Sequence, residues 1–329
     1  MTGFTPTPGT TTAATSAGDD DVVIPFRTVR SAMSGRIVRL ATAVDDVLTR
    51  HQYPEPVSRI LGEALALAAL LGSQLKFDGR LIVQTKSDGP VGFLVVNYDT
   101  AGTLRGYASF DKARLETPPA GSKSWTSGQL LGHGHLAMTI DQGADMDRYQ
   151  GLVAMSGGTL TAAALEYFRA SEQLPTYMRL AVARHFANGA WHWRAGGLMV
   201  QNVSPEGGKD AAPPVDDAGN EGLLGAGDDH WCRVELLAST VEDHELLDPM
   251  LSPDRLLYRL FHEEGVRTSD PAHLRMACRC SRDAVGAFLQ NFGPDKLADM
   301  KDPDGSVTVT CEFCATPYRF TDADLGGRD

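Results

Sequence analysis

The alternation of apolar and polar residues near the start of the chain predicts a strand followed by a helix. Residues 36–40 alternate as a half-buried strand does. Thr42 is a suitable cap for a helix that carries Val44, Val47 and Leu48 on one side. The first elements are therefore short, and they are of mixed type.

A longer apolar segment covers residues 60–75, with Gly62, Glu63 and Gln74 as its few interruptions. Its apolar residues lie almost all round a helix, so we expect this helix to be buried against a sheet. The segment is shorter than the roughly 20 residues that a membrane span requires. It predicts a core helix, and we expect no membrane partner.

Short strand patterns separated by turn residues dominate the following region. The strand candidates are residues 81–86, 91–98, 104–110, 135–140, 151–155, 178–183 and 198–203, and a helix is expected from Thr159 to about residue 170. The first three candidates predict an antiparallel meander. Because no regular alternation of strand and helix indicates a parallel sheet, the predicted class is α+β, with an antiparallel sheet packed against helices.

Residues 204–229 differ in composition from the segments on both sides. They are rich in Pro, Gly and Ala and contain seven acidic residues against one lysine. This composition predicts a flexible acidic insertion.

Residues 230–270 read as a helical linker. Ser252 can cap a helix that has Pro253 in its first turn. The next residues form an apolar stripe of Leu256, Leu257, Leu260 and Phe261. Because so short a segment cannot bury this stripe by itself, we expect the linker to dock on a neighbour.

The last predicted domain, residues 271–322, is small and contains two pairs of cysteines. A helix is expected from Ser281 to Leu289, a second at 294–300, and a hairpin after residues 307–309. The apolar residues are too few for an independent core, and domains of this size usually need a metal.

Four cysteines, Cys278, Cys280, Cys311 and Cys314, have the spacing of zinc ligands. Residues two apart in an extended chain face the same side, and the second pair has the spacing of a turn around a metal. We therefore predict one Zn²⁺ bound by four thiolates. From the residues alone the zinc is either structural or part of a redox switch, since oxidation of the sulfurs would eject it.

Composition narrows the class of protein. The net charge of −12 argues against a nucleic-acid partner. Five cysteines, four of them in metal spacing, favour a reducing cytoplasm over a secreted disulfide scaffold. Residues 1–21 lack the basic start and apolar run of a signal peptide, and we expect a disordered tail over residues 1–25.

Other candidate sites are weaker. His133 and His135 flank a glycine, a pattern more typical of a turn than of a metal site, and Cys232 has no partner at metal spacing. No phosphate-binding loop follows a predicted strand. Nothing in the sequence argues for an enzyme, so no catalytic residue is assigned.

The cysteine pattern, together with several upstream segments, resembles the bacterial 33-kilodalton heat-shock protein family of redox-regulated holdase chaperones. The upstream segments are residues 75–79 (LKFDG), 148–151 (RYQG), 171–175 (SEQLP) and 257–264 (LYRLFHEE). The resemblance covers roughly residues 27–322 and keeps the same order along the chain.

The resemblance implies a three-part protein: an α+β chaperone core at 26–203, the linker folded over it, and the zinc domain. It further implies that oxidation forms the disulfides Cys278–Cys280 and Cys311–Cys314 and releases zinc. The exposed surface would then bind unfolded or partly unfolded client proteins without ATP, with a homodimer as the active form. The longer tail and acidic insertion depart from the family pattern and affect the expected activation threshold.

Two other classes remain as alternatives. The first is a zinc-ribbon binding protein with a purely structural zinc, which would carry grouped basic residues for nucleic acid. The second is an enzyme with a pocket in the first domain, which would need a convergent polar cluster there.

Overall fold

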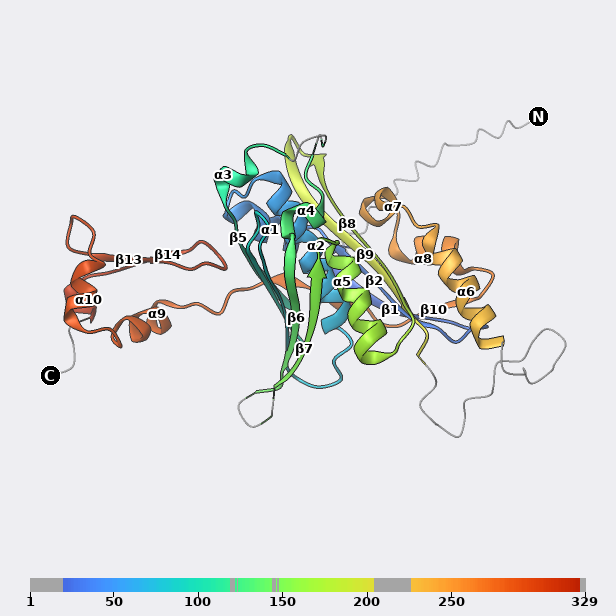
Figure 1. Cartoon of the computed structure of the whole chain (residues 1–329). Helices are drawn as coiled ribbons and strands as arrows, with labels where there is room; N and C mark the ends of the chain where they lie inside the picture. The colour runs from blue at the N-terminus through green and yellow to red at the C-terminus, as the bar shows by residue number, and fades with distance from the viewer. Residues whose placement is uncertain are drawn as a thin grey trace, which may run out of the picture.

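The computed structural model describes residues 20–118, 122, 124–143, 146, 148–203 and 226–325. Within these residues, two six-stranded sheets face each other across a central helix (Figure 1). The first sheet, sheet A, has the order β10-β1-β2-β9-β8, and β11 also pairs with β1. Its strands are β1 (Val22–Thr28), β2 (Ser34–Leu40), β8 (Thr176–Ala187), β9 (Ala190–Gln201), β10 (Val266–Thr268) and β11 (Ala272–His273).

The second sheet, sheet B, has the order β12-β5-β4-β3-β6-β7. Its strands are β3 (Arg80–Ser87), β4 (Phe93–Asp99), β5 (Thr103–Ser109), β6 (His133–Asp141), β7 (Tyr149–Ser156) and β12 (Arg275–Met276). The predicted meander is confirmed, because β3, β4 and β5 pair antiparallel in chain order. One pairing differs: β12 lies parallel to β5.

Helix α2 (Glu55–Gly72) explains why its sequence is apolar almost all round. Residues from Val57 to Leu71 contact strands of both sheets, and most of them are fully buried. A helix between two sheets has no solvent-facing side, so the pattern lacks the polar stripe of a surface helix. The expected core helix is confirmed, and it packs against two sheets.

Shorter helices close the edges of this core. They are α1 (Thr42–Arg50), α3 (Lys112–Leu115), α4 (Ser127–Leu131) and α5 (Leu160–Tyr167), and α5 continues as a π-helical turn, η1 (Phe168–Glu172). Thr159 caps α5 through the Ala162 N–H, as the sequence predicted. The π-helical turn was not foreseen.

The linker helices cover the outer face of sheet A (Figure 1). They are α6 (Ala226–Ser239), α7 (Asp243–Leu247) and α8 (Pro253–Phe261). The predicted stripe on α8 is buried against Phe26, Ile37 and Val200 of the sheet. The linker therefore docks on the core, as its short apolar stripe required.

The C-terminal module, residues 277–325, projects from the opposite side of the core (Figure 1). It contains α9 (Arg282–Leu289), α10 (Pro294–Asp299), the hairpin β13 (Val307–Thr310) and β14 (Pro317–Phe320), and α11 (Asp322–Leu325). Its buried apolar cluster consists of Leu289, Val307 and Phe320.

Three predicted boundaries need correction. The tail was expected to reach residue 25, but β1 begins at Val22, and residues 1–19 lie outside the described residues. The acidic insertion was placed at 204–229; residues 204–225 lie outside the described residues, and α6 begins at Ala226. The boundary at 270 separates two short strands, β10 and β11, that both pair with β1.

Membrane insertion finds no support among the helices. In the described part of the chain, none is long and apolar enough to cross a bilayer.

Candidate metal centre

Four cysteines from two distant segments meet at the junction of the C-terminal module and the core. The sulfur atoms of Cys278, Cys280, Cys311 and Cys314 all lie within 4.8 Å of one another. This is the only group of three or more potential metal ligands found among the described residues. The sequence therefore identified the residues that the fold brings together.

The distances between the sulfur atoms are close to those expected for four ligands arranged tetrahedrally around one cation. The Sγ atoms of Cys278 and Cys311 are 3.7 Å apart, and those of Cys280 and Cys314 are 3.3 Å apart. In a tetrahedral site with Zn–S bonds of about 2.3 Å, neighbouring sulfurs lie about 3.8 Å apart. The four cysteines are thus arranged so that they can hold a metal ion.

Backbone hydrogen bonds position both pairs. The first pair directly follows β12, where Ala277 N–H donates to the Leu104 carbonyl of sheet B at 3.1 Å. The second pair lies in the turn between β13 and β14, where Cys311 N–H donates to the Thr316 carbonyl at 3.0 Å. Ala315 adopts the left-handed conformation (φ 54°) that lets this turn bend back on itself.

Polar neighbours make the sulfurs unequal. The Tyr318 hydroxyl donates to Cys280 Sγ at 3.1 Å, and Cys314 Sγ lies 3.2 Å from Thr316 Oγ1. Burial raises the pKa of the Cys280 thiol to about 12 and also raises the pKa of Cys311. For Cys314 burial acts in the same direction, but hydrogen bonds with Thr316, Cys280 and Cys278 together outweigh it and bring the pKa to about 7.

The cysteine turn also contacts the edge of the core. The Arg105 guanidinium on β5 lies 4.2 Å from the centre of the Phe313 ring. Burial, followed by the negative charge of Glu312, raises the pKa of Tyr107 on the same strand. Both contacts join the turn between the second pair of cysteines to sheet B.

Two arginines next to the first pair of cysteines are engaged with acidic residues. Arg279 forms an ion pair with Asp99 of β4, and Arg282 lies 3.2 Å from Asp324 of α11. Their positive charge is therefore shared with carboxylates, and Arg279 connects the cysteine segment to the core.

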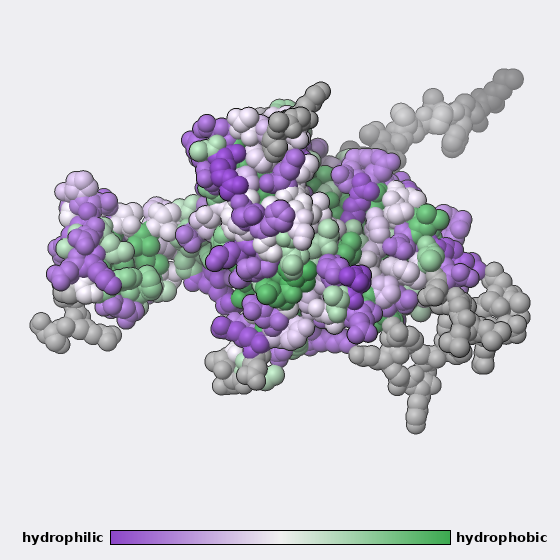
Figure 2. Space-filling view, in the orientation of Figure 1, coloured by the Kyte–Doolittle hydropathy of each residue, from purple (hydrophilic) through white to green (hydrophobic). Residues whose placement is uncertain are grey.

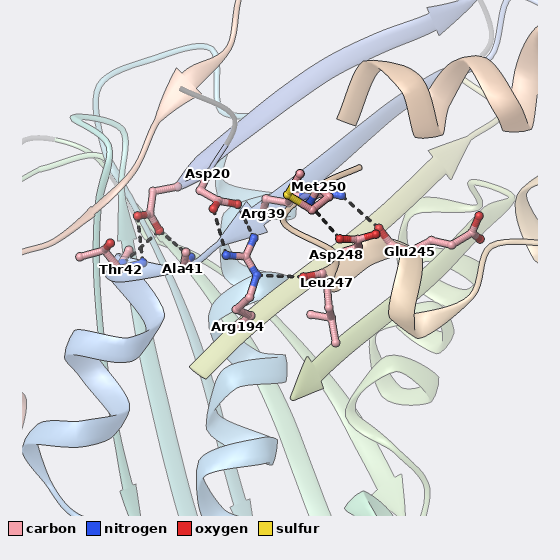
Figure 3. Close-up of polar contacts among 11 residues, drawn as sticks. Asp20, Arg39, Ala41, Thr42, Arg194, Glu245, Leu247, Asp248 and Met250 are labelled. Carbon is pink, nitrogen blue, oxygen red and sulfur yellow. Dashed lines mark hydrogen bonds and ion pairs between the residues drawn. The ribbon is translucent and has the colours of Figure 1, made fainter. Parts of the chain in front are cut away.

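Buried arginines on the outer face of sheet A bind the linker (Figure 3). Arg39 Nη2 on β2 donates to the Glu245 carbonyl at 3.0 Å, and Arg194 Nε on β9 donates to the Leu247 carbonyl at 2.9 Å. Both carbonyls lie at the C-terminal end of α7, where positive charge complements the helix dipole. Arg194 also forms an ion pair with Asp20.

The contact of α7 with β9 leaves no space for a side chain at Gly196. A Cβ atom there would lie 2.6 Å from the Leu246 carbonyl oxygen. These polar contacts and the close packing at Gly196 together hold the linker over the apolar face of sheet A.

The weaker candidates from the sequence lie apart from the cysteine centre. His133 lies at the start of β6, 3.8 Å from Asp88, and Cys232 is an exposed free thiol on α6. Sequence reasoning missed Tyr318, Thr316 and Arg105, because no local pattern marks residues that reach the site through the fold.

Sequence reasoning also missed the titration of Glu63, although it noted this residue as an interruption of the apolar helix. Its carboxylate accepts hydrogen bonds from Ser127 Oγ at 3.1 Å. Burial raises its pKa to about 7. The single carboxylate within the apolar segment 60–75 was the available signal.

The fold and the four-cysteine centre define an α+β protein with a small module, attached to its core, whose cysteines can hold a metal ion. A model of the family described as Hsp33 protein matches residues 21–321. The chain therefore belongs to the Hsp33 family.

Relatives and a solved structure agree with this assignment. A 33 kDa chaperonin of Caulobacter vibrioides is 46% identical, over 92% of this chain and 95% of its own length. One from Shewanella loihica is 35% identical, over 88% and 89%. The crystal structure of the 33 kDa chaperonin from Thermotoga maritima matches this fold with a TM-score of 0.73, over 93% of this chain and 97% of the solved chain. The two sequences are 22% identical, so this match supports the fold.

Proposed function

We propose that this protein is a cytoplasmic, redox-regulated chaperone that holds unfolding proteins without ATP. In the reduced state, Cys278, Cys280, Cys311 and Cys314 would bind one Zn²⁺ as thiolates. Zinc, when bound, supplies a strong link among the four sulfurs and keeps them deprotonated. The observation that carries the proposal is the apolar face of sheet A, which is covered by a linker that residues 266–276 join to the cysteine segment.

The proposed switch is oxidation of the sulfurs. Each pair, Cys278 with Cys280 and Cys311 with Cys314, would form a disulfide. For each pair, two thiolates give two electrons to one peroxide, which takes up two protons and is reduced to two molecules of water. Because the thiolate ligands are then consumed, the cation is released, and the small module loses what folds it.

The connection between module and linker supports propagation of this change. Residues 266–276 run along the edges of both sheets as β10, β11 and β12, between α8 and the first cysteine. Unfolding of the module removes the Arg279 and Phe313 contacts at the end of this segment. The linker would then leave sheet A, and the exposed apolar surface would bind clients, with a homodimer as the active form.

The test follows zinc release and client protection together. Purified protein is treated with peroxide at raised temperature, and zinc, disulfides and aggregation of a model client are measured in parallel. We expect zinc release, the two local disulfides and suppressed aggregation. Zinc release without suppressed aggregation would contradict the chaperone proposal.

The zinc-ribbon alternative has less support. Basic residues of the module are paired with carboxylates: Arg319 with Asp304, Lys301 with Asp322 and Arg282 with Asp324. Such pairing leaves little positive charge for phosphate contacts. Salt-dependent retention on DNA or RNA would revive this alternative.

A further inference from the structure

Three segments that are far apart in the sequence meet at a cavity that the metal centre and the linker do not use. Leu75, Tyr149 and Glu172 come from the segments 75–79, 148–151 and 171–175, respectively. The cavity has a volume of about 220 Å³ and lies between the end of α2, strands β6 and β7, and the turn η1. Figure 2 shows apolar residues gathered on this face, over β6, β7 and α5.

The inner wall of the cavity is apolar. Leu81 and Met138, each 4% exposed, and Phe168, 7% exposed, contribute to it. A dry cavity of about 150 Å³ binds benzene in other proteins. The space here therefore suits a ring or a short alkyl chain, and it is too small for a large cofactor.

The rim of the cavity carries the exposed carboxylate of Glu172, which accepts a hydrogen bond from a buried tyrosine. The Tyr167 hydroxyl donates to Glu172 Oε1 at 2.6 Å, and the Tyr149 hydroxyl lies 3.3 Å from that of Tyr167. Tyr167 is 7% exposed, so its buried ring fixes the direction of this hydrogen bond. The π-helical turn ends at Glu172, and Gln173, which follows directly, is in the left-handed conformation.

The positive side chains nearby in the sequence are engaged elsewhere. Arg169 lies 2.6 Å from Glu166, and Arg148 lies 3.7 Å from Asp141. No ion pair found within the described residues involves Glu172. Its charge is therefore available to a cation from outside the chain.

We propose that this cavity binds a small amphipathic primary amine, with its apolar body inside and its ammonium group on Glu172 and Tyr149. The carboxylate selects the charge, the tyrosine rings add attraction for a cation, and the apolar wall selects the body of the ligand. This site is independent of the proposed redox switch, because it lies in the core and shares no residue with the cysteine centre.

The test uses the reduced, zinc-loaded full chain and two probes of similar shape. Phenethylamine and the neutral phenethyl alcohol are titrated by calorimetry, while the Met138 methyl signal is followed by NMR. The amine should bind about tenfold more tightly than the alcohol, since a hydrogen bond to a charged group is the stronger one. Equal binding of the two probes, or no change at Met138, would overturn the proposal.

Three variants locate the site. Glu172→Gln should abolish the preference for the amine, whereas Glu166→Gln, which removes a carboxylate already paired with Arg169, should keep it. Ile140→Phe should fill the cavity and weaken the binding of both probes. A preference that survives in Glu172→Gln would refute the role of this carboxylate, and undiminished binding to a folded Ile140→Phe protein would refute the cavity itself.

Discussion

The core and the C-terminal module achieve order by different means. The core buries an extensive apolar cluster around α2, whereas the module buries only Leu289, Val307 and Phe320 in its own cluster. A large core is stable by burial alone, whereas a module with so little apolar surface usually needs a metal or another cross-link. Under the proposed switch, this difference would let oxidation unfold one part of the chain while another part stays folded.

The linker is intermediate between these two regions. Its buried apolar side chains, such as Leu256, Leu257 and Phe261, are as deeply buried as those of the core, and they form one cluster with residues of sheet A. Its helices are short, and short helices are marginal in isolation. Order in the linker therefore depends on docking, and docking can be lost without loss of the sheet.

Removal of zinc should give the largest effect. A chelator added under reducing conditions should unfold the module and leave the core intact, because structural zinc contributes on the order of 10 kcal/mol to such modules. Amide hydrogen exchange should lose protection in β13 and β14 and retain it in α2. The Cys232→Ala variant is the control and should respond to the chelator as the wild type does. If β13 and β14 kept full protection from hydrogen exchange without the metal, the proposed difference between module and core would be contradicted.

Truncation of the linker's main anchor should have the next largest effect. Phe261 is fully buried and stacks on Phe26 with ring centres 5.5 Å apart. Phe261→Ala should weaken docking by about 3 kcal/mol and expose α6 to α8 to hydrogen exchange in the reduced protein. Tyr258→Ala, at a position 66% exposed on the same helix, is the matched control and should leave protection unchanged.

Neutralisation of Glu63 tests the core itself. Burial raises its folded pKa to about 7 from 4.5, so the native state binds more protons between these pH values. Stability should therefore fall as the pH rises through this window, and Glu63→Gln should stabilise the core by about 2 kcal/mol near pH 8 and little near pH 4.5. Urea unfolding of the core at several pH values measures this free energy of unfolding, with Glu116→Gln as the exposed control. If Glu63→Gln left the pH dependence of stability unchanged, the prediction would be wrong.

The smallest expected effect concerns a single hydrogen bond to the metal centre. Tyr318→Phe removes the hydroxyl that donates to Cys280 Sγ. It should lower zinc affinity about fivefold, the amount expected from loss of about 1 kcal/mol. Competition with a chromogenic chelator measures the zinc affinity, and Tyr258→Phe is the control. An unchanged affinity in Tyr318→Phe would show that this hydroxyl does not support the site.

The sequence by itself determined the class of the fold and the identity of the four cysteines. Alternation over 81–86 and 104–110 marked strands because a sheet repeats every two residues, and the stripe on α8 marked a helix that needs a partner. The spacing of Cys278, Cys280, Cys311 and Cys314 marked a metal centre because local geometry places each pair on one side of the chain.

Only the tertiary structure decided what these elements contact. The apolar pattern of α2 required burial but did not specify two sheets, and no local signal placed Tyr318 beside Cys280 or Arg194 beneath α7. The cavity at Glu172 likewise joins three segments that the sequence separates. Periodicity and spacing encode contacts within a few residues of the chain, whereas these contacts depend on the packing of both sheets.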